Sequence, residues 1–108
     1  MQNSFVEFHG SFTYDTFGAI DSALREAREC LDDDELSEHD RDWMRYVCQR
    51  GMTVHVNAVL PEYADRFLAA AILGAFARRA VAGRVDVTRG NQRLDTFASE
   101  ASPSEVVA

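Results

Sequence analysis

The sequence predicts one α+β domain, in which an antiparallel sheet carries two helices on one face. Its 108 residues are near the commonest size of a single domain. Apolar residues make up 46% of the chain and aromatic residues 10%, which is enough to build one core. Segments with the periodicity of strands and of helices follow one another in the order β-α-β-β-α-β. We therefore expect residues 1–97 to form the domain and residues 98–108 to be a disordered tail.

A strand and an amphipathic helix are expected at the start of the domain. Residues 5–12 alternate as a strand does, with Val6, Phe8 and Phe12 on one side. Thr13 or Asp15 can cap the helix that follows, because both side chains accept hydrogen bonds from helical amides. Apolar residues then recur at helical spacing, at Phe17, Ile20, Leu24, Ala27 and Leu31.

A β-hairpin is expected in the middle of the chain. Segments 42–49 and 52–60 are rich in strand-forming residues, and Arg50-Gly51 between them contains the glycine that a tight turn needs. A two-residue loop at this place pairs Val47 with Val54 and puts Trp43 on the core face. It also puts Arg45 on the core face, a weakness that a bulge or a loop of different length would remove.

A second helix is expected from Pro61 to Arg79. Its predicted apolar stripe consists of Ala64, Phe67, Leu68, Ala71, Ile72 and Ala75. Leu73 and Phe76 extend the apolar surface around most of the helix, so we expect a second chain to cover part of it. Ala70 and Gly74, four residues apart, would let another backbone come close.

The remaining residues are expected to complete the sheet. Val85 and Val87 alternate inward as a fourth strand, and residues 89–91 can turn into a short fifth strand through Leu94 and Phe97. This order of elements indicates a ferredoxin-like split βαβ fold, an open sheet whose two helices cover a single face. Because many unrelated functions use this scaffold, the fold class alone assigns none of them.

The charge of the chain is negative and unevenly distributed. The net charge is -7, and all 11 basic residues are arginine, which excludes Schiff-base catalysis by lysine and the lysine of a P-loop. Residues 1–65 hold 14 acidic residues against five arginines, whereas residues 66–95 hold six arginines against two acidic residues. If the fold keeps these segments apart, the molecule has two faces of opposite sign and can associate with itself.

The sequence favours a cytoplasmic protein without a membrane anchor. The longest strongly apolar run, residues 67–77, is too short to cross a bilayer, and the N-terminus does not resemble a secretory signal. Cys30 and Cys48 are therefore expected to be free thiols. Without C-x-x-C spacing, they cannot build a structural zinc site by themselves.

Two binding motifs fail on inspection. In the hairpin region, only Arg50-Gly51 matches the pattern by which RNA-recognition domains stack bases, and the aromatic positions are lost, so we expect no nucleic-acid partner. A calcium loop started at Asp32 would need glycine at Ser37 and glutamate at Trp43.

These observations favour a non-enzymatic interaction or regulatory domain, expected to be a homodimer joined through the open sheet face or the second helix. Residues 30–42 hold seven acidic residues and one arginine, which indicates a solvated connection and a docking patch for a basic partner. An inhibitor or immunity-like protein is one version of this function. The predicted partner-binding residues are Asp32, Asp33, Asp34, Glu35, Glu38 and Asp40.

A binding site for a small ligand or a metal on the open sheet face is the alternative. Its predicted residues are Glu7, His9, Tyr46, Cys48 and His55. Two histidines with a carboxylate are a known ligand set for transition metals, and a thiol beside an imidazole can act as a nucleophile and its base. A small monooxygenase or isomerase is a third hypothesis that no residue singles out, and no cofactor is predicted.

Overall fold

The computed structural model describes residues 5–32, 36, 38–61 and 66–100, without the side chains of Glu38 and His39. Five strands form one antiparallel sheet: β1 (Phe5–Thr13), β2 (Val47–Arg50), β3 (Thr53–Pro61), β4 (Ala82–Arg89) and β5 (Gln92–Ala98). Their order across the sheet is β2-β3-β1-β4-β5. The helical elements are α1 (Phe17–Glu29), the short α2 (Glu38–Arg41), the 3₁₀ helix η1 (Asp42–Tyr46) and α3 (Arg66–Arg79).

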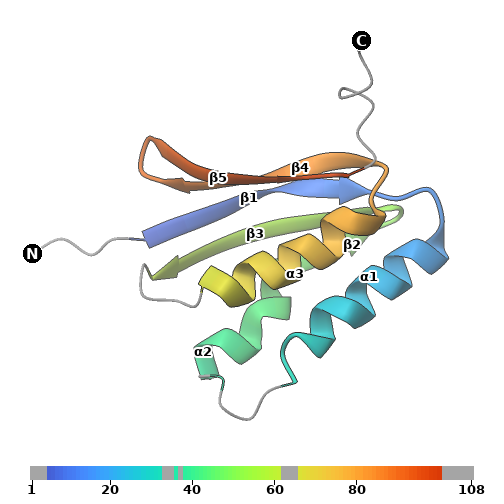
Figure 1. Ribbon diagram of the computed structural model, residues 1–108, viewed down its shortest axis with the longest axis horizontal. Coiled ribbons are helices and arrows are strands. Elements are labelled where there is room, and N and C mark those ends of the chain that lie inside the picture. The colour runs from blue at the N-terminus through green and yellow to red at the C-terminus, as the bar shows by residue number, and fades with distance from the viewer. Residues whose placement is uncertain (1–4, 33–35, 37, 62–65, 101–108) are drawn as a thin grey trace, which may run out of the picture.

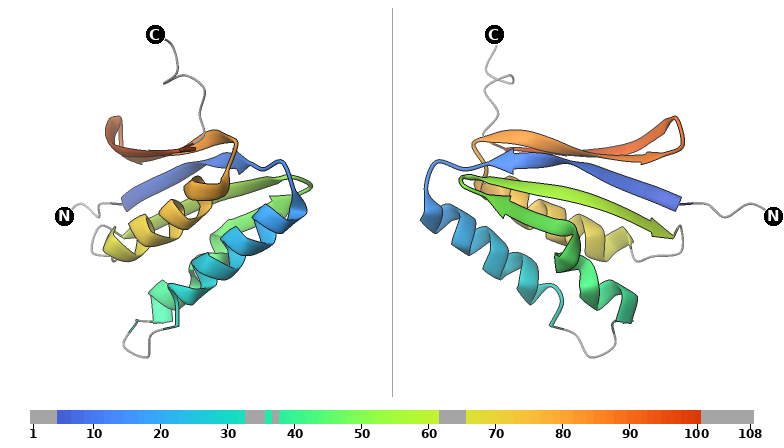
Figure 2. Two further views of the ribbon diagram at one scale, coloured as in Figure 1. Left: turned by 45° about the vertical axis from the view of Figure 1, so that its right-hand side comes forward. Right: turned by 180° about the vertical axis from the view of Figure 1, so that it is seen from behind.

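The two long helices, α1 and α3, lie side by side on the same side of the sheet, and none of the described helices lies on the opposite face (Figure 1; Figure 2). The predicted α+β class, with an antiparallel sheet and two main helices, is confirmed, as is the fifth strand. Alternate strand residues face the helices and are buried, for example Val54, Val56, Ala58 and Leu60 of β3. The residues between them lie on what we call the open face.

The close pairing of β1 with β4 depends on two glycines. Gly10 and Gly83 have φ angles of 155° and 107°, which side-chain-bearing residues rarely adopt. A Cβ on Gly10 would lie 2.0 Å from the carbonyl oxygen of Arg84, and one on Gly83 would lie 2.2 Å from that of Ser11. Glycine is therefore required at both positions for β4 to lie against β1.

The N-cap of α1 is one residue after Asp15, the nearer of the two predicted caps. Thr16 is the N-cap, and its Oγ1 accepts a hydrogen bond from the amide of Ala19 at 3.0 Å. Thr13 cannot cap the helix because it is still paired within β1. Phe17, predicted to lie in the apolar stripe, is 58% exposed, and the buried residues of α1 are Ile20, Ala23 and Ala27.

The predicted second strand, residues 42–49, is wrong in its first half. Residues 42–46 form η1, and β2 begins only at Val47. The 3₁₀ turn lets Trp43 be 1% exposed in the core while Arg45 stays at the surface, where it pairs with Asp42 at 3.5 Å. An extended strand would have put Trp43 and Arg45 on the same face, which is the conflict seen in the sequence.

The hairpin register is also shifted by two residues from the prediction. Val47 pairs with Val56, and the loop is Gly51-Met52 instead of Arg50-Gly51. Gly51 has a φ of 59° as the first loop residue. In a type II′ turn, only the first of the two loop residues has a positive φ, and here that residue is Gly51. With Arg50-Gly51 as the loop, a type I′ turn would be needed, and Arg50 would also have to adopt a positive φ.

The predicted second helix starts later and is rotated relative to the expected stripe. Pro61 is the last residue of β3, and α3 begins at Arg66. Phe67 is 89% exposed and Ala71 is exposed, whereas the predicted Leu68, Ile72 and Ala75 are buried. Ala64 lies outside the described residues. Helix α3 packs on both the sheet and α1, so its buried arc also includes Ala69, Leu73, Phe76 and Ala77.

Residues 98–100, at the start of the predicted tail, are bonded to the folded domain. Ala98 closes β5, and Ser99 is buried, with its hydroxyl donating to the carbonyl oxygen of Ala80. The amide of Glu100 donates to the carbonyl oxygen of Ala77 at 3.3 Å. Residues 101–108, the rest of the predicted tail, lie outside the described residues.

Candidate functional site

The open face of the sheet brings the predicted ligand residues together only in pairs. Glu7 and His9 are both on β1, and Nε2 of His9 lies 2.7 Å from Oε1 of Glu7. His55 on β3 lies opposite Ser11, and His9 lies opposite Asn57, so the two histidines are diagonal neighbours. Within the described part of the chain, no three histidine, cysteine or acidic side chains gather closely enough to hold a metal ion.

Cys48 and His55 form the second pair. Because of the shifted register, Cys48 of β2 lies directly opposite His55 of β3, whereas the predicted pairing of Val47 with Val54 would put Cys48 opposite Thr53. Both side chains are exposed, and Cys48 is a free thiol, as is Cys30. The side chains that lie around this pair are Tyr46, Arg50 and Asn57, and none of these three is a carboxylate that could orient the imidazole.

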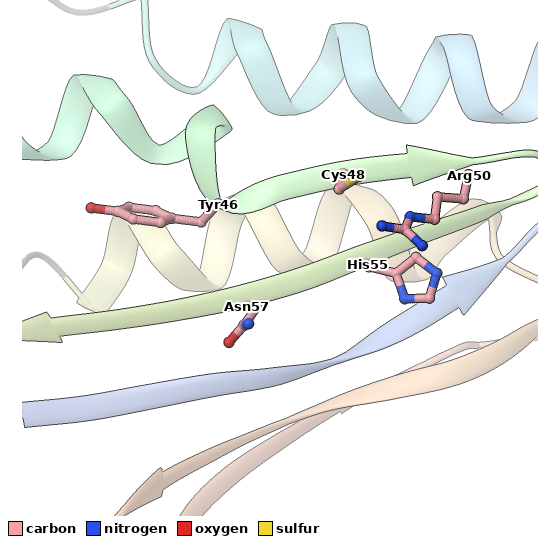
Figure 3. Close-up of a pocket in the computed structure, with 5 residues that line it drawn as sticks. All are labelled: Tyr46, Cys48, Arg50, His55 and Asn57. Carbon is pink, nitrogen blue, oxygen red and sulfur yellow. The ribbon is translucent and has the colours of Figure 1, made fainter.

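A hollow of about 260 Å³ contains this pair. It is lined by Tyr46, Cys48, Arg50, His55 and Asn57 (Figure 3). In Figure 3, the guanidinium group of Arg50 extends from β2 toward the His55 ring on β3, whereas the Tyr46 hydroxyl points away from both. Four of the five residues are exposed and Tyr46 is half-buried, so the hollow is open to solvent.

Two of the lining residues, Arg50 and Asn57, were not among the predicted site residues. Arg50 was assigned to the hairpin loop, but it is the last residue of β2 and pairs with Thr53. The signal that could have found it is the position of Gly51, which favours a loop that starts with glycine. Asn57 follows His55 by two residues and so shares its face of β3.

The Tyr46 ring, which forms one wall of the hollow, packs against a buried side chain of the core. The Tyr46 ring lies edge-on to Trp43, with centroids 5.9 Å apart and an interplanar angle of 88°. Trp43 in turn lies edge-on to Phe8, at 5.4 Å and 76°. These contacts join the start of β2 to the centre of the sheet, and edge-to-face aromatic pairs of this kind are stabilising.

The predicted acidic docking patch is only partly described. Asp32 is exposed after the end of α1, and Asp40 in α2 is half-buried. Asp33, Asp34 and Glu35 lie outside the described residues, and so does the Glu38 side chain. The patch therefore stays a prediction.

Within the described residues, part of the acidic segment lies beside part of the basic segment. Glu26 of α1 lies between two arginines from the last turn of α3: it pairs with Arg78 at 2.9 Å and also with Arg79. Hydrogen bonds from Arg79 and Arg78 hold the pKa of the Glu26 carboxyl below its ordinary value. The fold thus puts an acidic helix beside a basic helix terminus, and part of the charge asymmetry is neutralised inside one molecule.

Large apolar side chains are exposed at two ends of the molecule. Phe5 is 48% exposed, Val59 52% and Phe67 89%, and they lie at the start of β1, the end of β3 and the start of α3. These three elements meet at the same end of the molecule (Figure 1; Figure 2). We call Phe5, Val59 and Phe67 the apolar end. Phe17, 58% exposed, is at the opposite end, where α1 begins.

Comparison with protein-family models, with curated proteins and with solved structures finds no match to this chain. In the part of the chain that the structure describes, no helix is both long and apolar enough to cross a membrane.

Proposed function

We propose that the chain is a non-enzymatic interaction domain that works as a homodimer, and that two copies meet at the apolar end. The observation that carries the proposal is the 89% exposure of Phe67, a large apolar side chain in the first turn of α3. Scattered apolar residues are normal on a surface, but a group of them marks an interaction site.

Strand pairing brings two members of the apolar end, Phe5 and Val59, together. Phe5 pairs with Pro61, and Val59 is two residues before Pro61 on the same face of β3. Phe67 follows at the start of α3, on the same end of the molecule (Figure 1). Burying one exposed Phe side chain completely contributes about 1.5–3 kcal/mol. With the half-exposed Phe5 and Val59 added, the total is comparable with the lower estimates of the cost of association, so we expect a dimer that depends on concentration.

A second copy fits this surface because the flanking charges are of both signs. Glu7 lies beside the apolar end on β1, and Arg66 precedes Phe67 in α3. In a two-fold contact, the same patch meets itself in reverse, so Glu7 of one copy can approach Arg66 of the other. Complementary charges of this kind give orientation to an apolar contact.

The proposal includes a ferredoxin-like split βαβ arrangement for the first four strands. Its support is that β1 lies between β3 and β4, that β2 lies outside β3, and that a long helix precedes β2 and another precedes β4. β5 then extends the sheet beside β4.

A basic protein is the further partner that the charge favours. The net charge of -7 and the exposed Asp32 support an acidic docking surface along the connection after α1. An inhibitor that covers a basic site of its partner is one form of this role. Binding of such a partner would weaken steeply with added salt, unlike the apolar homodimer contact.

The test is the solution mass by light scattering, measured across a range of protein concentrations and salt. Phe67→Ser is compared with Phe17→Ser, a matched control in the first turn of the other long helix. We expect the wild type and Phe17→Ser to form a dimer that salt does not dissociate, and Phe67→Ser to be a monomer with an unchanged circular dichroism spectrum. A wild type that stays monomeric at every concentration contradicts the proposal, as does a Phe67→Ser dimer as stable as the control.

A further inference from the structure

The hollow between β2 and β3 is lined by groups that donate hydrogen bonds. Arg50 provides a guanidinium group, His55 an imidazole and Asn57 an amide, and the thiol of Cys48 is a weak donor. No acidic residue lines it, although the chain as a whole has a net charge of -7. We propose that this hollow binds a small molecule through an oxyanion, a carboxylate or a phosphate group.

Arg50 and His55 are placed to hold one anionic group together. Cys48 pairs with His55 and Arg50 pairs with Thr53, so Arg50 and His55 are diagonal neighbours on the open face. Long side chains reach across such a diagonal, and Figure 3 shows the Arg50 guanidinium extending toward the His55 ring. The planar guanidinium matches a carboxylate or phosphate with two parallel hydrogen bonds.

The acidic groups of the open face do not compete for this position. Glu7 is hydrogen-bonded to His9 at 2.7 Å, and Asp86 accepts a hydrogen bond from Thr96 Oγ1 at 3.0 Å and lies 3.6 Å from Arg84 Nε. Among the described residues, no carboxylate lies within ion-pair distance of Arg50. Its positive charge therefore faces the hollow without a counter-charge from the described part of the protein.

The size of the hollow limits the ligand. A volume of about 260 Å³ corresponds to roughly nine water molecules at about 30 Å³ each, so a ligand of on the order of ten non-hydrogen atoms fits. This is below the usual volume of a site for drug-sized molecules. The Tyr46 ring offers an apolar wall to the body of such a ligand, because its hydroxyl points away from Arg50 and His55 (Figure 3).

Titration of ¹⁵N-labelled protein with inorganic phosphate and, separately, with acetate tests the proposal by NMR. Sodium chloride at matched ionic strength is the reference for general salt effects. We expect saturable shifts at the amides of Arg50, His55 and Asn57 with at least one of the two anions, and the anion that saturates identifies the phosphate or the carboxylate class. Arg50→Gln should weaken the affinity at least about tenfold, because it removes the charge-assisted hydrogen bonds.

Arg93→Gln, on the opposite edge strand β5, is the matched control and should leave the affinity unchanged. His55→Gln is a second variant at the site and should also weaken binding. Shifts that do not saturate, or that chloride reproduces, would overturn the proposal, as would equal effects of Arg50→Gln and Arg93→Gln. The result is independent of the homodimer, because Arg50 ends β2 and His55 lies near the start of β3, whereas the apolar end is at the other end of β3 (Figure 1).

Discussion

Replacing Tyr14 by phenylalanine should destabilise the domain through the C-terminus of α3. The Tyr14 hydroxyl donates a hydrogen bond of 2.8 Å to the carbonyl oxygen of Phe76, and Tyr14 is only 2% exposed. Phe76 is one of the last four residues of α3, whose carbonyls lack the usual partner within the helix. The amide of Ala80 donates to Ala77 instead, at 3.4 Å. Tyr14→Phe therefore leaves a buried carbonyl without its donor.

The expected cost is about 1–3 kcal/mol, the usual penalty for a buried polar group that loses its partner. Burial also raises the pKa of the Tyr14 hydroxyl, so it remains a donor at any pH used for unfolding. With an m value of about 1–2 kcal/mol/M for urea, the unfolding midpoint should fall by roughly 1 M. Trp43, the only tryptophan and 1% exposed, reports unfolding by fluorescence.

Tyr46→Phe is the matched control, because Tyr46 is only half-buried and its hydroxyl points away from Arg50 and His55 (Figure 3). We expect this variant to change the free energy of unfolding by less than about 0.5 kcal/mol. If Tyr14→Phe costs no more than Tyr46→Phe, the hydroxyl does not stabilise the end of α3 and the reasoning is wrong. A fall in the m value without a fall in stability would instead point to a change in the unfolded state.

Two further predictions concern the pairing of β1 with β4 and the contact between the helices. Gly10→Ala should lower the free energy of unfolding in urea by at least about 2 kcal/mol, because its Cβ would lie 2.0 Å from the Arg84 carbonyl oxygen. Gly51→Ala, whose Cβ would have no atom within 4 Å, should lower it by less. Equal losses of stability in the two variants would refute the steric argument. Glu26→Gln should destabilise the protein at pH 7. Because the folded-state pKa of Glu26 is lowered, this difference should start to shrink as the pH falls below about 4 and be lost as the pH passes through the lowered pKa; a difference as large at about pH 2 as at pH 7 would show that the ion pairs are not its cause.

The elements that were predicted well are those whose periodicity is unambiguous. β1 alternates Val6, Phe8 and Phe12 with polar residues, and all three are buried. β4 and β5 are joined at Gly90-Asn91, where Gly90 has a φ of 60°, as the turn residues indicate. In each of these cases, neighbouring residues alone specify the backbone.

The elements that were predicted poorly are those with more than one compatible arrangement. Helix α3 is apolar on most of its surface, so its sequence cannot show whether Phe67 or Leu73 turns inward. Contact with α1 as well as the sheet selects Leu73, and Phe67 is left exposed. The candidate site was predicted in part for the same reason: Cys48 and His55 were placed on the right face, but Arg50 enters the hollow only because the register is shifted by two residues.

By itself, the sequence determined the α+β class, the order of the strands and of the two long helices, and the charge of the chain, because periodicity and composition are properties of neighbouring residues. Only the tertiary structure decided the 3₁₀ turn around Trp43, the register of β2 and the pairing of Glu26 with Arg78 and Arg79. Each of these depends on contacts between residues distant in the chain. The 3₁₀ turn buries Trp43 against Phe8 while Arg45 stays exposed, which an extended strand cannot do because residues two apart in a strand share a face.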